Sequence, residues 1–263
     1  MLGFIGFGNM AGAIAKGILK SNLLKPEEII VSRRDTVKLK EAHDELGICV
    51  TEDNREVARR SNVIILSVKP QMFSSVIKQI KDDVTEDKLI VSIAAGKSTT
   101  WLCLEFEKEI KIIRCMPNTP ALVGEGCTGI CANELVSKED MEYILTLFNS
   151  LGLAIEVPEN LMDVVVGVSG SSPAYVFLFM EALADAAVMK GMPRKQAYQF
   201  VAQSVLGSAK LMLDTGMHPG ELKDMVCSPG GTTIEAVKVL EDMGLRSAVI
   251  NAAVSCIEKS KNL

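Results

Sequence analysis

Near its start the chain reads Leu2-Gly3-Phe4-Ile5-Gly6-Phe7-Gly8-Asn9-Met10-Ala11, a short apolar run followed by a GxGxxA turn. The apolar run predicts a strand, and the residues from Asn9 to Lys20 have the periodicity of a helix. In such a unit the first glycine allows a tight turn and the second admits a phosphate to the backbone. The small third residue lets the helix pack closely. Because glycine turns also serve packing alone, the meaning of this one depends on its context.

The context is an alternation of short apolar strands and helices, which implies parallel βαβ units with right-handed crossovers. We expect an α/β Rossmann domain, a doubly wound and mostly parallel sheet. Its turn would bind a dinucleotide through Gly6, Phe7, Gly8, Asn9, Met10 and Ala11. The expected strands are Leu2–Phe7, Glu28–Ser32, Ile48–Thr51, Asn62–Ser67, Lys88–Ile93, Lys111–Cys115, Cys127–Cys131 and Ala154–Val157. The expected helices are Asn9–Lys20, Thr36–Leu46, Asn54–Arg59, Gln71–Ile80, Ser98–Glu105 and Lys138–Leu151.

The strand signal ends at Pro158, which divides the chain into a nucleotide-binding domain of residues 1–158 and an all-α domain of residues 159–263. The helix from Pro173 is apolar around most of its circumference, and so is much of the next one. A domain of about 100 residues has little interior in which to bury two such helices. We therefore expect a subunit interface there. The expected helices are Glu159–Val168, Pro173–Lys190, Arg194–Thr215, Pro219–Val226, Thr232–Asp242 and Leu245–Lys259.

Composition excludes several classes of protein. A net charge of −5 over 263 residues gives no general basic field for nucleic acid or an anionic membrane. The seven cysteines include no CxxC pair, and with two histidines they fit neither a zinc site nor a disulfide framework. The most apolar stretch, Pro173–Met189, is interrupted by Glu181 and Asp185, so we expect no membrane span. The chain opens into a strand without a basic leader. We expect a cytoplasmic protein without a metal.

The end of the second strand predicts which dinucleotide binds. This position lies about 20 residues beyond the glycine turn and contacts the adenine ribose. Here it reads Ser32-Arg33-Arg34-Asp35, whereas an NAD enzyme would place an acidic residue at the strand's end. Serine can donate to a 2′-phosphate and arginine can clamp it, so Ser32, Arg33 and Arg34 favour NADPH, with NADH still possible. The alternatives are a solvated arginine pair and, with a small shift in alignment, Asp35 as the residue that contacts the ribose.

Further segments follow strand ends or punctuate the helical half. They are Ser67-Val68-Lys69-Pro70-Gln71, Ser92-Ile93-Ala94-Ala95-Gly96, Arg114-Cys115-Met116-Pro117-Asn118-Thr119-Pro120, Val168-Ser169-Gly170-Ser171-Ser172-Pro173-Ala174-Tyr175 and Ser228-Pro229-Gly230-Gly231-Thr232-Thr233. In this order, over nearly the whole chain, they resemble pyrroline-5-carboxylate reductase. The MPNTP and SPGGTT segments are far more specific than the glycine turn.

The resemblance implies reduction of 1-pyrroline-5-carboxylate to L-proline by NAD(P)H. It also implies a homodimer through the C-terminal helices and allows a decamer of five dimers. It suggests that Asn54, Ser67, Val68, Lys69, Pro70, Ile93, Ala94 and Ala95 line the nicotinamide half of the cofactor site. Glu159, Thr232 and Thr233 match positions that the family associates with substrate, and Ser172, which replaces a common glycine, either contacts substrate or caps its helix.

The residues themselves suit an imine better than a ketone. Reducing a ketone needs a positioned proton donor, usually His or Lys, whereas a cyclic imine can arrive already protonated on nitrogen. We assign the substrate carboxylate to the backbone amides of Gly230, Gly231, Thr232 and Thr233, and the Thr233 hydroxyl to the ring nitrogen. The alternative is an N-capped helix after a Pro-Gly-Gly turn, with no ligand.

Three single residues keep two interpretations each. Lys69 holds cofactor or substrate charge, chiefly through its backbone, or is solvated. Asn118 contacts substrate or is a turn residue that bonds its own backbone. Glu159 contacts substrate or favours a helix N-terminus.

Two other functions compete with the reductase. β-Hydroxyacid dehydrogenases share a Rossmann domain followed by helices, but they carry a general-acid lysine early in the first long helix. Here no lysine occurs between Gly170 and Lys190. The second alternative is a regulatory protein that binds NADPH without turnover, and the intact MPNTP and SPGGTT segments argue against it.

Overall fold

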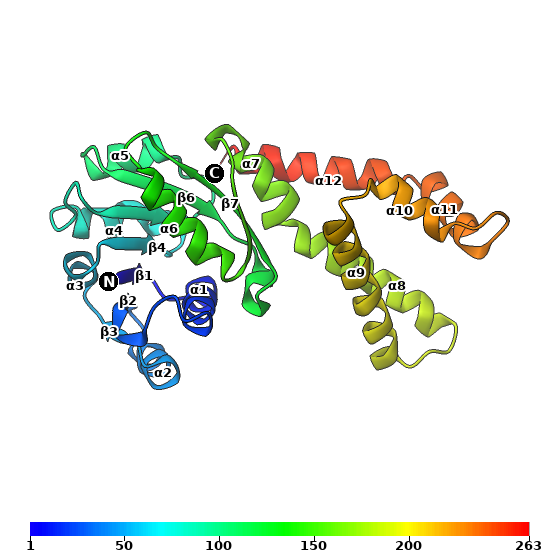
Figure 1. Ribbon diagram of the computed structural model, residues 1–263, viewed down its shortest axis with the longest axis horizontal. Coiled ribbons are helices and arrows are strands. Elements are labelled where there is room, and N and C mark those ends of the chain that lie inside the picture. Colours follow the sequence, from blue (N-terminus) through cyan, green and yellow to red (C-terminus); the bar gives the residue numbers. More distant parts are fainter. Residues whose placement is uncertain (263) are drawn as a thin grey trace. The chain divides into compact units, whose positions relative to one another are not determined.

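The computed structural model describes residues 1–262 and divides the chain into two compact units. The first unit comprises Met1–Ser171 together with the C-terminal stretch from Cys256, and the second is Ser172–Ser255. Figure 1 shows the sheet of the first unit and the helices of the second.

The first unit is built on one eight-stranded sheet with the order β3-β2-β1-β4-β5-β6-β7-β8. Strands β1 to β6 run parallel, β7 is antiparallel to β6, and β8 is parallel to β7. This confirms the predicted Rossmann architecture and its mostly parallel sheet. The strands are β1 (Leu2–Ile5), β2 (Ile29–Ser32), β3 (Cys49–Thr51), β4 (Val63–Leu66), β5 (Leu89–Ser92), β6 (Lys111–Met116), β7 (Gly126–Ala132) and β8 (Gly152–Glu156).

Helices cover both faces of this sheet, because alternate strand residues point to opposite sides. Leu2 and Phe4 of β1 face one apolar core, which α1, α2 and α6 complete, whereas Ile5 faces a second core completed by α3, α4 and α5. The sheet's carboxyl edge is thus left as the place where ligands can approach. The helices are α1 (Asn9–Lys20), α2 (Thr36–Leu46), α3 (Asn54–Arg60), α4 (Phe73–Ile80), α5 (Thr99–Phe106) and α6 (Lys138–Asn149).

The chain after Pro158 first packs with the sheet unit. It forms the 3-10 turn η4 (Glu159–Leu161), helix α7 (Met162–Val165) and the π-helical turn η5 (Val166–Gly170). Met162 is fully buried there. The end of the last helix, α12 (Leu245–Ser260), belongs to the same unit, where the Ser260 hydroxyl donates to Asp163 Oδ1 at 2.7 Å. By packing, the sheet unit therefore extends to Ser171, beyond the boundary predicted after residue 158.

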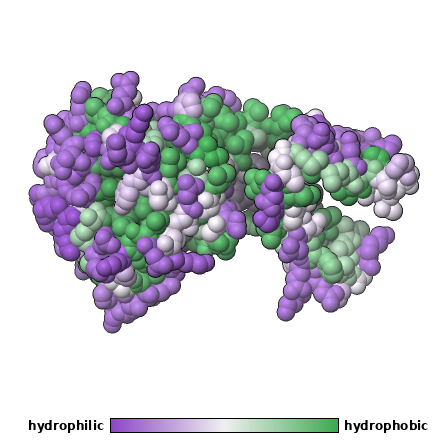
Figure 2. Space-filling view, in the orientation of Figure 1, coloured by the Kyte–Doolittle hydropathy of each residue, from purple (hydrophilic) through white to green (hydrophobic). Residues whose placement is uncertain are grey.

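The second unit consists of α8 (Ser172–Met189), α9 (Arg194–Thr215), α10 (Pro219–Val226), α11 (Thr232–Asp242) and most of α12. Its buried apolar residues are Ala184, Ala197 and Val201, where α8 packs on α9. Large side chains remain exposed, among them Leu178 and Phe200, each 68% accessible, and Leu213, at 76%. Figure 2 shows hydrophobic surface over this unit, including α12. In a single copy, the second unit therefore buries few of its apolar side chains and leaves many large ones exposed to water.

The continuous helical run Glu159–Met189 is the one candidate for a membrane span among residues 1–262. It is 31 residues long with a mean hydropathy of 1.4 over its most apolar window, which satisfies the length and composition of a spanning helix. A single run of this kind is only a weak indication, because core helices of soluble proteins satisfy the same criteria. Two acidic residues inside it, Glu181 and Asp185, lie on α8.

Candidate active site

The two glycines of the turn between β1 and α1 are there for different reasons. Gly6 has φ +87°, and a Cβ atom on it would lie 2.6 Å from Val68 Cγ1, so the chain itself requires glycine. Gly8 has an ordinary φ of −93°, and a Cβ atom there would meet nothing within 4 Å. Packing and backbone conformation therefore do not explain Gly8. Its open space is what a pyrophosphate approaching the backbone needs.

Helix α1 begins at this turn with its first amides open. Gly8 is the N-cap residue and offers no side chain, and the first turn contains no acidic residue. Ala11 is 1% exposed, which shows the close packing that the third position of the motif provides. Uncapped amides and the positive end of the helix dipole favour an anion. The geometry fits the phosphates of a dinucleotide.

The segment after β4 holds the glycine turn in place. The Ser67 hydroxyl donates to the carbonyl oxygen of Gly6 at 2.5 Å, and Val68 packs against Gly6. Lys69 is exposed and is followed by the 3-10 turn that starts at Pro70. The structure thus brings Ser67–Pro70 to the glycine turn, and the Ser67 hydroxyl already has an acceptor inside the protein.

The four residues at the end of β2, residues 32–35, have different environments in the structure. Ser32 is fully buried, and its hydroxyl donates to Asn54 Oδ1 at 2.7 Å, so it does not lie at the surface where we predicted contact with a 2′-phosphate. Arg33 Nη1 donates to the carbonyl oxygen of Phe7 at 2.5 Å, whereas Arg34 is exposed. Asp35 caps α2 by accepting from the amide of Lys38 at 3.1 Å. Arg33 is therefore hydrogen-bonded directly to the glycine turn.

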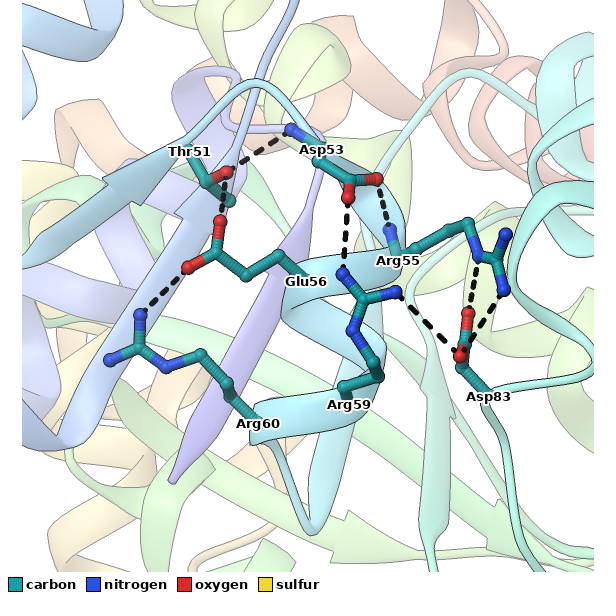
Figure 3. A network of polar contacts seen from close by, with 7 residues as sticks. All are labelled: Thr51, Asp53, Arg55, Glu56, Arg59, Arg60 and Asp83. Atoms are coloured by element: carbon teal, nitrogen blue, oxygen red, sulfur yellow. Dashed lines mark hydrogen bonds and ion pairs between the residues drawn. The ribbon is translucent and has the colours of Figure 1, made fainter.

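A network of charged side chains fixes the start of α3, where Asn54 lies. Arg55 Nε contacts Asp83 Oδ2 at 2.6 Å, and Asp53 caps the helix through the Arg55 amide at 2.8 Å. The hydrogen bond from Arg55 lowers the pKa of Asp83 below its usual value. Asn54 itself donates to Gln79 of α4 at 2.8 Å. Figure 3 shows the network, which consists of Thr51, Asp53, Arg55, Glu56, Arg59, Arg60 and Asp83.

The loop after β5 carries the predicted nicotinamide contacts Ile93, Ala94 and Ala95. Ala94 is 6% exposed, and its amide donates to the Ser92 hydroxyl at 3.4 Å. The loop ends at Ser98, which caps α5 by accepting from the Trp101 amide at 3.0 Å. Both ends of this loop are therefore fixed by short-range hydrogen bonds.

The structure gives Asn118 a bridging role. Its Oδ1 accepts from the Cys127 amide at 2.9 Å, and its Nδ2 donates to the Ser169 carbonyl at 3.2 Å. These bonds join the loop after β6 to β7 and to the π-helical turn. Substrate contact by Asn118 remains a prediction, because its side chain already has partners at both ends.

Glu159 is likewise engaged within the sheet unit. Its Oε1 accepts from the Thr99 amide at 2.7 Å, and its Oε2 accepts from the Thr99 hydroxyl at 2.6 Å. Arg114, 6% exposed on β6, adds an ion pair at 3.5 Å. Of our two interpretations of Glu159, a carboxylate at a helix N-terminus matches this geometry. The helix is α5, which is distant in sequence.

Sequence reasoning missed Thr99, Arg114 and Gln79 as partners of site residues. One signal was available for Arg114, since a charged residue inside the apolar strand Lys111–Met116 needs a buried partner. Thr99 and Gln79 carried no such signal, because their partners come from distant parts of the chain.

In the helical unit, the SPGGTT segment forms a tight turn into α11. Gly230 has φ +69°, which favours glycine, and a Cβ atom on Gly231 would lie 2.4 Å from Ser228 Oγ and 3.1 Å from the Ser228 carbonyl oxygen. The N-cap residue of α11 is Gly231, without a side-chain cap. Thr232 and Thr233 occupy the first turn, where open amides favour a carboxylate. The alternative of a helix that follows a Pro-Gly-Gly turn without binding a ligand stays open.

The remaining predicted residues and the histidines are placed as follows. Ser172 is the first residue of α8. His218 caps α10, since its Nδ1 accepts from the Gly220 amide at 3.1 Å. His43 is exposed on α2. Among residues 1–262 no group of three His, Cys, Asp or Glu could hold a metal ion.

Comparison with known proteins identifies both halves of the chain. Residues 159–263 match the family model described as pyrroline-5-carboxylate reductase dimerisation, and residues 1–96 match that of NADP oxidoreductase, coenzyme F420-dependent. A pyrroline-5-carboxylate reductase from Escherichia coli (strain K12) is 51% identical over 262 residues, covering 100% of this chain and 97% of the relative. One from Methanosarcina acetivorans is 45% identical with the same coverage.

Solved structures agree. The pyrroline-5-carboxylate reductase of Coxiella burnetii is similar with a TM-score of 0.93 and 38% identity, over 99% of this chain and 97% of that one. The Plasmodium falciparum pyrroline carboxylate reductase, solved with NADP bound, has a TM-score of 0.90 and 36% identity, with the same coverage.

Proposed function

The chain belongs to the pyrroline-5-carboxylate reductase family, and we propose that its sheet unit holds NADPH while the start of α11 holds the carboxylate of the substrate. The enzyme reduces 1-pyrroline-5-carboxylate to L-proline with NAD(P)H. The observation that carries the division of roles is that α1 and α11 each begin at a glycine N-cap without a side-chain cap, Gly8 and Gly231. Each offers backbone amides to an anion.

The cofactor site that we propose consists of the glycine turn, the end of β2 and the loops after β4 and β5. Bound there, NADPH would supply the hydride. The open space at Gly8 admits the pyrophosphate, and Arg33 supplies positive charge beside it. We keep the full set of cofactor residues predicted from sequence, with one change. Ser32 is buried, and we propose that it acts indirectly by orienting Asn54 through their hydrogen bond.

The substrate site that we propose uses Gly230, Gly231, Thr232 and Thr233. The backbone amides at the start of α11 bind the carboxylate, and the Thr233 hydroxyl contacts the ring nitrogen. An imine already protonated on nitrogen needs no lysine or histidine as proton donor, only orientation and exclusion of water. Ser172, Asn118 and Glu159 remain predictions as substrate contacts, and the last two already bind groups within the protein.

The function is tested by following NADPH oxidation with 1-pyrroline-5-carboxylate and, separately, NADPH oxidation with 2-oxoacids and NADP⁺ reduction with 3-hydroxyacids. We expect turnover with the imine alone. Turnover only with the acids would favour the hydroxyacid dehydrogenase, and no turnover with NADPH bound would favour the regulatory protein. The absence of a lysine from α8 argues against the dehydrogenase.

The enzyme is a homo-oligomer, and we propose that it dimerises through α8 to α12 and that five dimers form a decamer. The exposed apolar side chains of the helical unit support this, because a monomer rarely leaves so much apolar surface in water. Light scattering would measure the mass. Leu178→Glu should release monomers, whereas Val37→Glu, at an equally exposed position on α2, should not. A Leu178→Glu oligomer of unchanged mass would contradict the proposed interface.

We also propose a cytoplasmic location and keep residue 158 as the boundary between the functional domains. All seven cysteines are free thiols, which suits a reducing compartment. A partner copy covering α8 would account for its apolar surface without a membrane. Cell fractionation tests the location, and recovery of the protein with membranes would contradict it.

A further inference from the structure

A partly buried link joins the start of α5 to the chain segment that leaves the sheet, with the Glu159 side chain 30% accessible. Glu159, in η4, binds Thr99 twice, through the amide at 2.7 Å and the hydroxyl at 2.6 Å. Thr99 is 5% exposed, so the hydroxyl has little access to water as an alternative partner. A carboxylate that accepts two such bonds at a helix N-terminus is held firmly, because the helix dipole favours its charge.

A buried cation supports the same carboxylate. Arg114 of β6 is 6% exposed and lies 3.5 Å from Glu159 Oε1. A buried guanidinium without an anion would be costly, so Arg114 and Glu159 hold each other in place. Three elements, α5, β6 and η4, therefore meet at one carboxylate.

This link lies directly beside the loop that follows β5. Thr99 is the first residue of α5, and the loop containing Ile93, Ala94 and Ala95 ends one residue before it. Fixing Thr99 therefore fixes one end of the loop, while the bond between the Ala94 amide and Ser92 fixes the other. The loop is short enough that a shift of Thr99 must move it.

We propose that Glu159 is a positioning residue for hydride transfer. Through Thr99 it holds the loop after β5 in the position that hydride transfer requires. The proposal rests on the proposed function, because it assumes that this loop lies beside the nicotinamide. It differs from the expectation that Glu159 contacts substrate. A misplacement of the reacting groups by about 1 Å can cost on the order of 100-fold in rate, so a residue that touches neither ligand can still control kcat.

The chain contains a reporter for this loop. Its single tryptophan, Trp101, lies on α5 two residues after Thr99, and Lys97 Nζ lies 4.8 Å from the centre of its ring. Trp101 fluorescence in the NADPH-free protein therefore reports the position of the loop relative to α5, without any turnover.

The test compares Thr99→Val, which removes the hydroxyl donor, with Thr99→Ser, which keeps it. In the NADPH-free protein we expect Thr99→Val to change acrylamide quenching of Trp101 and to speed hydrogen exchange of residues 93–99. Thr99→Ser should match the parent. With substrates, Thr99→Val should lower kcat about tenfold and raise the deuterium isotope effect on hydride transfer, with KM for the imine nearly unchanged.

Glu159→Ala removes both bonds to Thr99 and the partner of Arg114, so it should change the same measurements at least as much as Thr99→Val. Adding Thr99→Val to it should cause no further loss, because the hydroxyl has then already lost its acceptor. If Thr99→Val fails to fold, Glu159→Ala carries the same measurements. A Glu159→Ala enzyme with raised KM for the imine beside an unaffected Thr99→Val would instead show direct substrate contact and overturn the proposal. Unchanged Trp101 quenching and kcat in both variants would also overturn it. In either case turnover by the parent enzyme would leave the proposed function intact.

Discussion

The guanidinium of Arg33 donates to the carbonyl oxygen of Phe7 at 2.5 Å, which ties the end of β2 to the middle of the glycine turn. The next residue, Arg34, is exposed. Adjacent arginines are therefore not equivalent: Arg33 places its charge beside the glycine turn, whereas Arg34 is exposed. This difference gives a sharper test of cofactor preference than the sequence alone allowed.

We expect Arg33→Ala to weaken NADPH binding about tenfold, the effect of losing one charge-assisted hydrogen bond, and to leave NADH binding nearly unchanged. Arg34→Ala is the matched control and should alter both affinities little. Dissociation constants measured by fluorescence titration give the comparison. If the ratio of the NADPH and NADH dissociation constants were the same in the parent and in Arg33→Ala, a role for Arg33 at the 2′-phosphate would be contradicted.

The two glycines of the turn should respond oppositely to alanine. Gly8→Ala meets open space at an ordinary φ, so folding stability should hold or rise by about 0.5 kcal/mol, while NADPH affinity falls at least about tenfold. Gly6→Ala should destabilise the fold by about 1–3 kcal/mol, because φ is +87° and Val68 is too close.

Thermal unfolding without cofactor and NADPH titration separate these effects. If Gly8→Ala destabilised the cofactor-free protein as much as Gly6→Ala does, Gly8 would be required for folding. The open space at Gly8 would then say nothing about a ligand.

The fold could be predicted from the sequence because its signals are local. Short apolar strands such as Leu89–Ser92 and the helix from Asn9 can be recognised from their own residues. The side chains of β1 alternate between the two apolar cores, as a strand covered on both faces predicts. The glycine turn was also local. All these features depend on residues within one turn or strand of each other.

The site was less predictable, because its hydrogen bonds join distant residues. Ser32 was predicted to donate to a 2′-phosphate, but in the structure it is buried in β2 and its hydroxyl bonds Asn54, 22 residues away. Glu159 finds Thr99 at a separation of 60 residues, and Asn118 finds Ser169 at 51. Residue type showed that these side chains could bind a ligand. It could not show that the protein itself supplies their partners.

Thr233→Ala should lower kcat/KM for the imine by about 1–2 kcal/mol, a usual loss for one hydrogen bond, and leave NADPH affinity unchanged. Thr233→Ser keeps the hydroxyl and serves as the control. Steady-state kinetics and cofactor titration make the measurement. Equal losses of NADPH affinity and imine turnover would indicate misfolding or a role other than contact with the ring nitrogen.

Two thiols in the sheet should be chemically inert. Burial, and then the nearby Glu159 carboxylate, raise the pKa of Cys131 to about 12, and burial raises the pKa of Cys115 well above its usual value. Because the thiolate is the reactive form, iodoacetamide at about pH 8 should modify neither residue in the native enzyme and both in urea. Peptide mass mapping identifies the modified sites. Alkylation of native Cys131 at the rate of the unfolded chain would contradict this.

The Arg55–Asp83 pair should contribute stability that depends on pH. The hydrogen bond from Arg55 lowers the pKa of Asp83, so this stability is complete above the unfolded value of about 3.9 and is lost as the pH falls through the folded value. Arg55 is half exposed, with 53% of its side chain accessible, and solvent screening limits the effect of Asp83→Asn to about 0.5 kcal/mol at neutral pH.

Urea unfolding at one fixed protein concentration measures this difference at about pH 7 and again at the lowest pH at which the protein stays folded, well below the unfolded aspartate pKa of about 3.9. We expect Asp83→Asn to be less stable than the parent at neutral pH and to approach it in acid, since the parent loses the ion pair there. Asp82→Asn, next in the chain and exposed, is the control and should show a smaller change. A deficit for Asp83→Asn that stayed constant between the two pH values would mean that packing, and not the charge of Asp83, fixes the start of α3.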